Sequence, residues 1–350
     1  MTTVQDQGLV SAPAATGTAR RLGALGGLAY RYGLLAVLLG LLVVFSLARS
    51  RFHTWDNTLI ILQSVSIVAV VALGVTVSMT VGGFDLSVGA NVGFVVMVTA
   101  QVMVRYNLTG ATAILAGLAA GLLVAAVNTL LIVVARVPDL VASLGTMFAF
   151  QGLALIITSG QSVSVGMDLG GGRVAPGRYD PDFLWFGTAK VLSIPVAVLV
   201  MIVIAAVVIV FLTYSRWGRA LYAIGGNPVA ARLAGIPVNR YRALAYVISG
   251  LCAACAGILL SARLGRGDVG AGDVYLLQAV AATLIGFAVL GANRPNPFGT
   301  LVGAVFLGVL INGLTMLNVP YYTQTFVQGA LLVAALLLSY AVAPRSRRAS

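Results

Sequence analysis

The sequence predicts an all-α integral membrane protein, a polytopic bundle of about ten transmembrane helices. Of its 350 residues, 60% are hydrophobic and 9% are charged, and the mean hydropathy is +1.02, which is typical of membrane proteins. Apolar runs of the roughly 20 residues needed to cross a bilayer recur along nearly the whole chain. They are continuous, whereas the strands of a membrane barrel would alternate in polarity over about ten residues.

The apolar runs define the domain organisation. Residues 1–29, rich in Ala, Thr, Ser and Gly, predict a flexible cytoplasmic tail. Arg20 and Arg21 precede the first span and no obvious cleavage site follows it, which favours an uncleaved helix over a signal peptide. Residues 30–342 form the transmembrane domain, and 343–350 form a cytoplasmic C-terminal tail. The predicted spans are 31–48, 59–81, 86–104, 111–135, 140–158, 190–213, 243–262, 275–290, 298–317 and 323–342.

The distribution of basic residues predicts the orientation. With the N-terminus inside, ten crossings place 13 of the 21 Lys and Arg residues in inner segments and leave 21 − 13 = 8 outside. Three Asp residues lie inside and six outside, so the balance is 13 − 3 = +10 against 8 − 6 = +2. Both termini are therefore expected in the cytoplasm. Membrane orientation also accounts for the net charge of +12, and no basic stretch is interleaved with aromatics, so no nucleic-acid partner is expected.

Residue types that catalyse reactions or bind metals are scarce. The chain has no Glu, one His (His53) and one Lys (Lys190), so a metal or acid/base site would have to be built from nine scattered Asp residues. Cys252 and Cys255 lie on one face of an apolar span and are expected to be small packing residues rather than a redox or metal pair. No phosphate-binding glycine pattern surrounds Lys190. We therefore expect no enzyme activity, metal or cofactor in this chain, and any ATP would be hydrolysed on another chain.

A short basic segment, "GGNPVAARLAGIPVNRYR" at residues 225–242, interrupts the apolar pattern. It lies in an inner loop of about 29 residues, about 214–242, that holds five Arg. Asn227 is a favourable N-cap, Pro228 suits the first helical position and Gly235 supplies a stop. The sequence thus predicts a short, capped helix on the inner side.

Two interpretations of this helix stay open. It could lie on the inner leaflet with its Arg side chains against lipid phosphates. Alternatively it docks onto a cytoplasmic partner, because small residues such as Ala231 permit close approach and Arg232 offers a charge.

A second polar stretch, "TVGGFDLSVGANVGF" at residues 80–94, places Asp85 against the membrane helices. An unpaired charge at mid-depth costs about 2.5–3.5 kcal/mol, so a partner is required. Asp85 could cap the third helix, or it could belong to a polar site at a broken helix. Ser87 and Asn91 lie four residues apart on one face, and Phe84 could stack on a sugar ring, so we regard these residues as candidates for the substrate path.

A third cluster lies in the fifth span, within "SLGTMFAFQG" at residues 143–152. Thr146 and Phe150 share a face and Gln151 is adjacent, a mixture suited to a neutral polyol. Hydrogen bonding between helices explains the polar residues equally well, and the same two interpretations apply to Asn128 and to the path candidate Asn312.

Two pairs of glycines have the small-xxx-small spacing of close helix contacts, and we interpret them as packing residues: Gly117/Gly121 and Gly299/Gly303.

Four stretches together resemble one protein family. "GGFDLSVGA", "LGTMFAFQGLALIITSGQSVS", "GGNPVAARLAGIPV" and "AYVISGLCAACAGILLSARLG" look like segments of the membrane permeases of bacterial ABC importers for simple sugars, the ribose-type group, and occur in that group's order. The similarity runs from about residue 40 to 342.

The resemblance implies the ABC importer permease fold and transport of a monosaccharide or related polyol across the bacterial inner membrane. The implied partners are a second permease subunit, a cytoplasmic ATPase that binds ATP and Mg²⁺, and an extracytoplasmic sugar-binding protein. By this resemblance, the loop that contacts the ATPase includes Asn227, Pro228, Ala231, Arg232 and Gly235.

The chain departs from the family pattern after the eighth span. Where many relatives carry Gly-Gly-Thr-Ser-Leu and then Gly-Gly-x-Gly, residues 285–299 read "IGFAVLGANRPNPFG", with Phe287 in place of a small residue. The stretch still predicts a turn through Asn293, Pro295 and Pro297, and the departure indicates a subgroup.

The largest predicted external feature is the outer loop at about 159–189. It could be a plain surface loop or the docking surface of the binding protein, in which case the candidate contacts are Asp168, Asp180, Asp182, Phe183 and Trp185.

Other functions are less consistent with the sequence. Related permeases carry nucleosides or branched-chain amino acids, and charged substrates would be expected to leave more charge in the path. An ion-driven secondary transporter would place carboxylates or His within its helices, and only Asp85 is a candidate.

Overall fold

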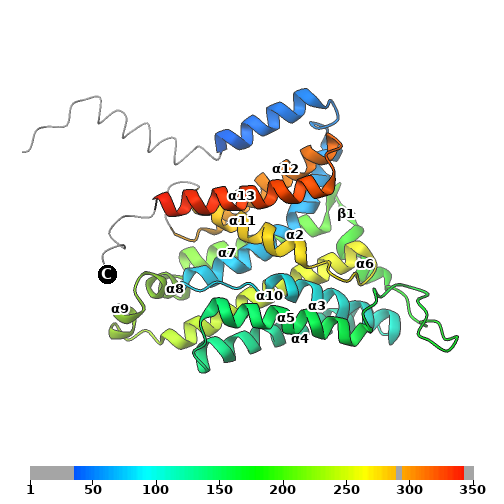
Figure 1. Cartoon of the computed structure of the whole chain (residues 1–350), viewed down its shortest axis with the longest axis horizontal. Coiled ribbons are helices and arrows are strands. Elements are labelled where there is room, and N and C mark those ends of the chain that lie inside the picture. The colour runs from blue at the N-terminus through cyan, green and yellow to red at the C-terminus, as the bar shows by residue number, and fades with distance from the viewer. Residues whose placement is uncertain (1–34, 289–293, 343–350) are drawn as a thin grey trace, which may run out of the picture.

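The chain folds as a bundle of long helices with two short strands at one end (Figure 1). The computed structural model describes residues 35–288 and 294–342, so both predicted tails and Asn293 lie outside the described residues. An apolar helix spans Leu35–Ala48. The helices that follow are α2 (Trp55–Thr80), α3 (Val88–Ala100), α4 (Gly110–Thr129), α5 (Asp139–Thr158), α6 (Pro181–Thr188), α7 (Val196–Tyr214), α8 (Arg216–Gly226), α9 (Pro228–Leu233), α10 (Val238–Leu264), α11 (Asp273–Ala288), α12 (Pro297–Met316) and α13 (Tyr321–Val342).

The helix lengths and composition confirm the all-α polytopic membrane fold. Within the described ranges, seven helices are long and apolar enough to cross a membrane: α2, α3 with its extension, α4 with its extension, α5, α7, α10 and α12. The extensions are π-helical turns, η1 (Gln101–Arg105) and η2 (Leu130–Val134). Leu35–Ala48 and α11 are shorter apolar helices. The count of ten spans stays a prediction.

Two predicted spans differ from their helices by five or six residues at the start, more than the other spans whose starts are described. The span expected from 190 begins at Val196 because β1 (Lys190–Val191) and β2 (Ile194–Pro195) form a small antiparallel hairpin. Leu192 and Ser193 occupy its turn with φ angles of +49° and +67°, values that such two-residue turns require and that Asn or Gly usually supply. The span expected from 243 begins at Val238, one polar turn earlier.

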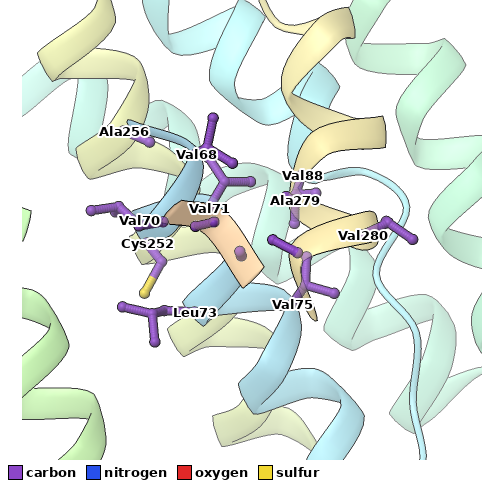
Figure 2. Packing of buried hydrophobic residues seen from close by; sticks show 14 of the residues in the cluster. Val68, Val70, Val71, Leu73, Val75, Val88, Cys252, Ala256, Ala279 and Val280 are labelled. Carbon is purple, nitrogen blue, oxygen red and sulfur yellow. The ribbon is translucent and has the colours of Figure 1, made fainter. Parts of the chain in front are cut away.

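Helix α2 forms the centre of the bundle and is surrounded by other helices. Residues 67–73 are buried in an unbroken run, the pattern of a helix that is apolar on all sides. Figure 2 shows Val68, Val71 and Val75 of α2 among Ala279 and Val280 of α11, with Cys252 and Ala256 of α10 beside them. Small side chains allow these backbones to approach closely, which favours van der Waals packing where lipid offers no hydrophobic driving force.

The glycine pairs have the packing role that their spacing predicts. A Cβ atom on Gly117 or Gly121 would meet Thr99 or Ala254, and one on Gly299 or Gly303 would meet the backbone of α11. Cys252 and Cys255 are free thiols within α10, and Cys252 is buried in the core, as expected of a packing residue.

The connections between helices fall at two ends of the bundle. We call the end that carries α8 and α9 the inner end and the opposite end the outer end (Figure 1). At the inner end, the Tyr222 hydroxyl donates to the carbonyl of Pro295 at 2.7 Å. At the outer end, the Gly110 N–H donates to Asp180 at 2.8 Å. This sorting is the one that alternating crossings would produce.

The outer segment, residues 159–195, is packed rather than loose. Its residue Val163 exchanges backbone hydrogen bonds with Gly267 at 2.7 and 2.8 Å, and Gln63 of α2 donates to the carbonyl of Gly187 at 3.0 Å. Asp180 caps α6, and Phe183 is fully buried. Phe183 therefore cannot be a docking contact, and that expectation is wrong, whereas Asp168, Asp182 and Trp185 are exposed.

Candidate functional site

Helix α9 has the caps that its sequence predicts. The side-chain oxygen of Asn227 accepts hydrogen bonds from the N–H groups of Val229 and Ala230, both at 3.0 Å, and Pro228 occupies the first turn. Gly235 follows with a φ of +81°, a conformation that glycine adopts without strain. The chain thus forms a separate short helix between α8 and α10.

One side of α9 is apolar and uncovered. Val229 and Leu233 lie four residues apart and are 65% and 85% exposed, and Arg232 beside them is exposed too. Ala231 differs, because it is buried against the bundle, where it anchors the helix instead of meeting a partner. Sequence reasoning identified the helix but not Val229 and Leu233, although their i, i+4 spacing is visible in the sequence.

Helix α8 holds α9 against the ends of the membrane helices. Its residues Leu221 and Ile224 are buried, and Gly225 lies so close to the carbonyl of Thr80, at the end of α2, that a Cβ atom would collide with it. Arg294, in the turn before α12, stacks over the ring of Tyr222 at 5.0 Å. Movement of α8 and α9 would therefore displace the end of α2 and the turn before α12.

A basic cavity of about 720 Å³ lies beside α9. Its charged residues come from the loop before α5, the first residue of α5, α9 and the start of α10: Arg136, Asp139, Arg232, Arg240 and Arg242. Arg242 donates to Asp139 at 2.6 Å, and the hydroxyl of Tyr246 donates to the other Asp139 oxygen at 2.8 Å. These bonds join the first residue of α5 to the second and third turns of α10, beside the cavity that Arg232 of α9 also lines.

Asp85 forms the centre of a buried hydrogen-bond network at the inner end. It is 2% exposed. One carboxylate oxygen accepts from the N–H and hydroxyl of Ser87, at 3.0 and 2.7 Å, and from the amide of Asn128 on α4, at 3.3 Å. The other oxygen accepts from the hydroxyl of Ser249 on α10, at 2.8 Å. Buried charges require such compensation, and here it links the start of α3 to α4 and α10.

The N-terminus of α3 partly answers whether Asp85 caps this helix. Ser87, not Asp85, is the residue before the helix, although Asp85 does accept the N–H of Ser87. Asp85 lies between the helical spans, and burial raises its pKa above the ordinary value while the bonds from Ser87 and Ser249 oppose that shift. The carboxyl thus joins helices, and it lines none of four cavities in the described part of the chain.

The neighbouring candidates also lie within helix packing. Asn91 is buried and donates to the carbonyls of Gly121 and Gly250, at 3.3 and 3.2 Å. Phe84 is partly buried against the main core. Both residues therefore take part in helix packing, and their place in the substrate path stays a prediction.

Of the three candidates on α5, two are buried within the bundle and one bonds to another helix. Phe150 is buried edge-on against Phe94 of α3, with ring centroids 5.1 Å apart, and Thr146 is 2% exposed. Gln151 donates to the Asp273 carboxylate at 2.8 Å, which joins α5 to α11, and it lines a small cavity of about 220 Å³.

Asn312 lies at the outer end, in a different cavity from Gln151. Its amide exchanges hydrogen bonds with that of Asn57, both at 3.1 Å, and it lines a cavity of about 550 Å³. The eight path candidates therefore do not converge on one site: Asp85 and Ser87 belong to the inner network, Phe84 and Asn91 to the helix packing near it, Thr146, Phe150 and Gln151 to α5, and Asn312 to the outer cavity.

Comparison with known proteins identifies the family of this bundle. The model of the family described as branched-chain amino acid transport system / permease component matches residues 57–336. The chain belongs to this family of permeases. No solved structure matches it.

Curated relatives of this permease cover nearly its whole length. The ribose import permease protein RbsC of Escherichia coli (strain K12) is 34% identical over 304 residues, 87% of this chain and 92% of its own. The probable ABC transporter permease protein YphD of the same strain is 34% identical over 318 residues, 91% of each chain. The D-allose transport system permease protein AlsC of that strain is 32% identical over 313 residues, 88% and 91%.

Proposed function

We propose that this permease is the membrane subunit of an ATP-driven ABC importer and forms the translocation path for a monosaccharide or related polyol. Its similarity to permeases named for ribose and D-allose, across about nine-tenths of their length, carries the proposal. A neutral substrate agrees with the few charges inside the described helices.

The assembly would need three kinds of partner. A cytoplasmic ATPase, with ATP and Mg²⁺, would dock on α9 and the rest of segment 225–242. A second permease subunit would complete the path, and an extracytoplasmic sugar-binding protein would meet the outer segment through Asp168, Asp182 and Trp185.

The charges of the two ends support an orientation with the inner end in the cytoplasm. Within the described ranges the inner end carries seven Arg and two Asp, a balance of 7 − 2 = +5, and the outer end carries eight basic and six acidic residues, 8 − 6 = +2. Because the more basic side of a membrane protein usually faces the cytoplasm, this balance supports our proposal that both termini are cytoplasmic and that the membrane is a bacterial inner membrane.

The geometry behind α9 provides a route for coupling. ATP binding would draw the ATPase against Val229, Arg232 and Leu233 and displace α9. Since α9 leads into α10, the displacement reaches α5 through the Arg242–Asp139 pair. Alternating access would follow from a rigid shift of these packed helices.

A branched-chain amino acid is the second candidate substrate, because the matching family is described by that class. The sugar remains our proposal since the relatives named above that specify a solute specify a sugar.

Uptake by reconstituted vesicles tests both candidates. Vesicles would contain this permease, its partner ATPase and its sugar-binding protein, and would be supplied with a labelled panel of pentoses, hexoses, polyols, nucleosides and leucine. We expect sugar uptake that requires ATP and the ATPase. Uptake of leucine alone would select the second candidate, and uptake that persists without the ATPase but collapses with the ion gradient would indicate a secondary transporter.

A further inference from the structure

A cavity opens at the outer end between α2, α10, α11 and α12. Its volume of about 550 Å³ lies within the roughly 300–1,000 Å³ range of ligand pockets. Apolar residues of the main core, including Val65, Val68 and Leu307, line its deeper part, and polar residues line the rest. A space of this kind can contact both the apolar and the hydroxyl-bearing faces of a small molecule.

Arg263 is the most unusual residue of this cavity. It lies within the last turn of the long span α10 and is half-buried. Its guanidinium donates to the hydroxyl of Ser64 at 3.3 Å, and no carboxylate of the described residues forms an ion pair with it. A guanidinium has five N–H donors, so most of them remain for a ligand. The negative end of the α10 dipole favours a cation here but binds none of those donors.

Neutral polar groups complete the lining. Tyr275 and Gln278 come from α11, and Asn312 and Thr315 from α12. Gln278 is 9% exposed, and its amide reaches Gln328 only at 3.5 Å. These groups provide donors, acceptors and one aromatic face, the combination that fixes the orientation of a small polar ligand.

The charge of the cavity favours a neutral ligand. Arg263 and Asp268 are its two charged residues, so the formal sum is 1 − 1 = 0. Asp268 already accepts from Arg266 at 2.8 Å and from Ser162 at 3.4 Å. It is therefore less available to the ammonium of an amino acid than the amides and hydroxyls are to a polyol.

We propose that this cavity binds a neutral sugar within a single permease protomer, with Arg263 and Gln278 as the principal hydrogen-bond donors and Tyr275 as the surface on which the ring packs. The inference rests on the proposed function for its substrate class, and it adds a binding site at the outer end.

Protection of a cysteine against a thiol reagent tests binding directly. Thr315→Cys would be made in a protein that also carries Cys252→Ala and Cys255→Ala, with Thr112→Cys, at the outer end of α4, as the matched control. The probes are D-ribose, D-allose and leucine. At ten times the dissociation constant, sugar should slow labelling of the cysteine at 315 about tenfold, because the free fraction is 1/(1 + [L]/Kd). Labelling at 112 should not change.

Variants of the lining identify the residues that bind. Arg263→Gln and Gln278→Leu should weaken protection about 10- to 100-fold, as expected for the loss of a hydrogen bond to a charged or buried group. Arg105→Gln, at the outer end but outside the cavity, should have no effect. Equal protection in Arg263→Gln would overturn the assignment of that residue even if the variant of Gln278 folds poorly.

The outcomes separate this site from the transport proposal. ATP-dependent sugar uptake without protection would overturn the cavity and keep the importer. Protection without uptake would keep the cavity and contradict the importer. Protection by leucine and not by sugar would overturn the ligand class.

Discussion

Arg242 at the start of α10 and Asp139 at the start of α5 form a part-buried ion pair at 2.6 Å. Tyr246 adds a hydrogen bond to the same carboxylate. Since residues 234–237 are all that separates α9 from α10, this pair is the nearest charged link between the proposed docking helix and a second span.

Breaking this pair should impair both stability and coupling. Arg242→Gln removes a hydrogen bond between charged groups, worth about 1.5–3 kcal/mol, so we expect a lower melting temperature and less ATP hydrolysis stimulated by substrate. Arg240→Gln is the matched control, because Arg240 lies on the same turn and forms no ion pair within the described residues. Equal effects of the two variants would contradict the role of the pair.

Gly83 should not tolerate a side chain. A Cβ atom there would meet the Tyr246 hydroxyl and an Asp139 oxygen, and overpacking of this kind typically costs about 1–3 kcal/mol. Thermal unfolding of the purified protein would measure the loss in Gly83→Ala. Gly40→Ala is the control, since nothing lies within 4 Å of that position, and an unaffected Gly83→Ala would show that this contact relaxes freely.

Asp85 should matter for the fold more than any one of its donors. Asp85→Ala leaves the hydroxyls of Ser87 and Ser249 without their acceptor, while the Asn128 amide keeps its bond to the Ser87 oxygen at 2.7 Å. Each unsatisfied buried group costs about 1–3 kcal/mol. Ser249→Ala removes one hydrogen bond and should destabilise less. Transport per folded molecule, measured together with thermal stability, distinguishes a structural role of Asp85 from a role in the substrate path. A stable Asp85→Ala protein without transport would place Asp85 in the path instead.

Leu233→Asp and Arg232→Glu should weaken copurification with the ATPase and leave membrane insertion intact. A charge at Leu233 would have to be desolvated on docking, and reversal at Arg232 would repel an acidic surface. Leu192→Asp provides the control, because Leu192 is 92% exposed at the outer end. Undiminished transport in both α9 variants would count against docking on α9.

Acid should loosen the outer segment through Asp180. The N–H groups of Gly110 and Asp182, and then the charge of Arg178, hold the pKa of Asp180 below its usual value. A carboxyl with a lowered pKa stabilises the fold above the unfolded value of about 3.9 and loses that contribution as pH falls through the folded pKa.

Hydrogen exchange across residues 159–195, corrected for intrinsic rates, would measure this effect. Asp180→Asn should exchange faster at neutral pH and lose the acid transition. Asp182→Asn should retain it, because the Asp182 side chain accepts no hydrogen bond from a described residue.

Sequence patterns predicted the features that depend on local rules. Asn227, Pro228 and Gly235 specify the ends of α9 by capping preferences that act within a few residues. The glycine pairs predicted close helix contacts for the same reason, since spacing alone brings two small residues to one face.

Features that depend on distant partners were not predictable. Leu192 and Ser193 adopt positive φ angles without the Gly or Asn that signals such turns, so the sequence predicts a span where the hairpin lies. The sequence shows Arg263 only as one of the outer charges, because its cavity is formed by helices that are distant in sequence. The sequence predicts that Asp85 needs a partner, but which residues of α4 and α10 supply it is set by the packing.

The hydrogen bonds that join the outer segment to α2, α4 and the loop before α11 affect how a binding protein would dock. Because Val163, Gly187 and Asp180 already hold the backbone, little conformational entropy remains to be lost when a partner docks. Association would then resemble the meeting of two rigid bodies, with an affinity set by surface fit, and release after delivery could be fast without any refolding of the surface left behind.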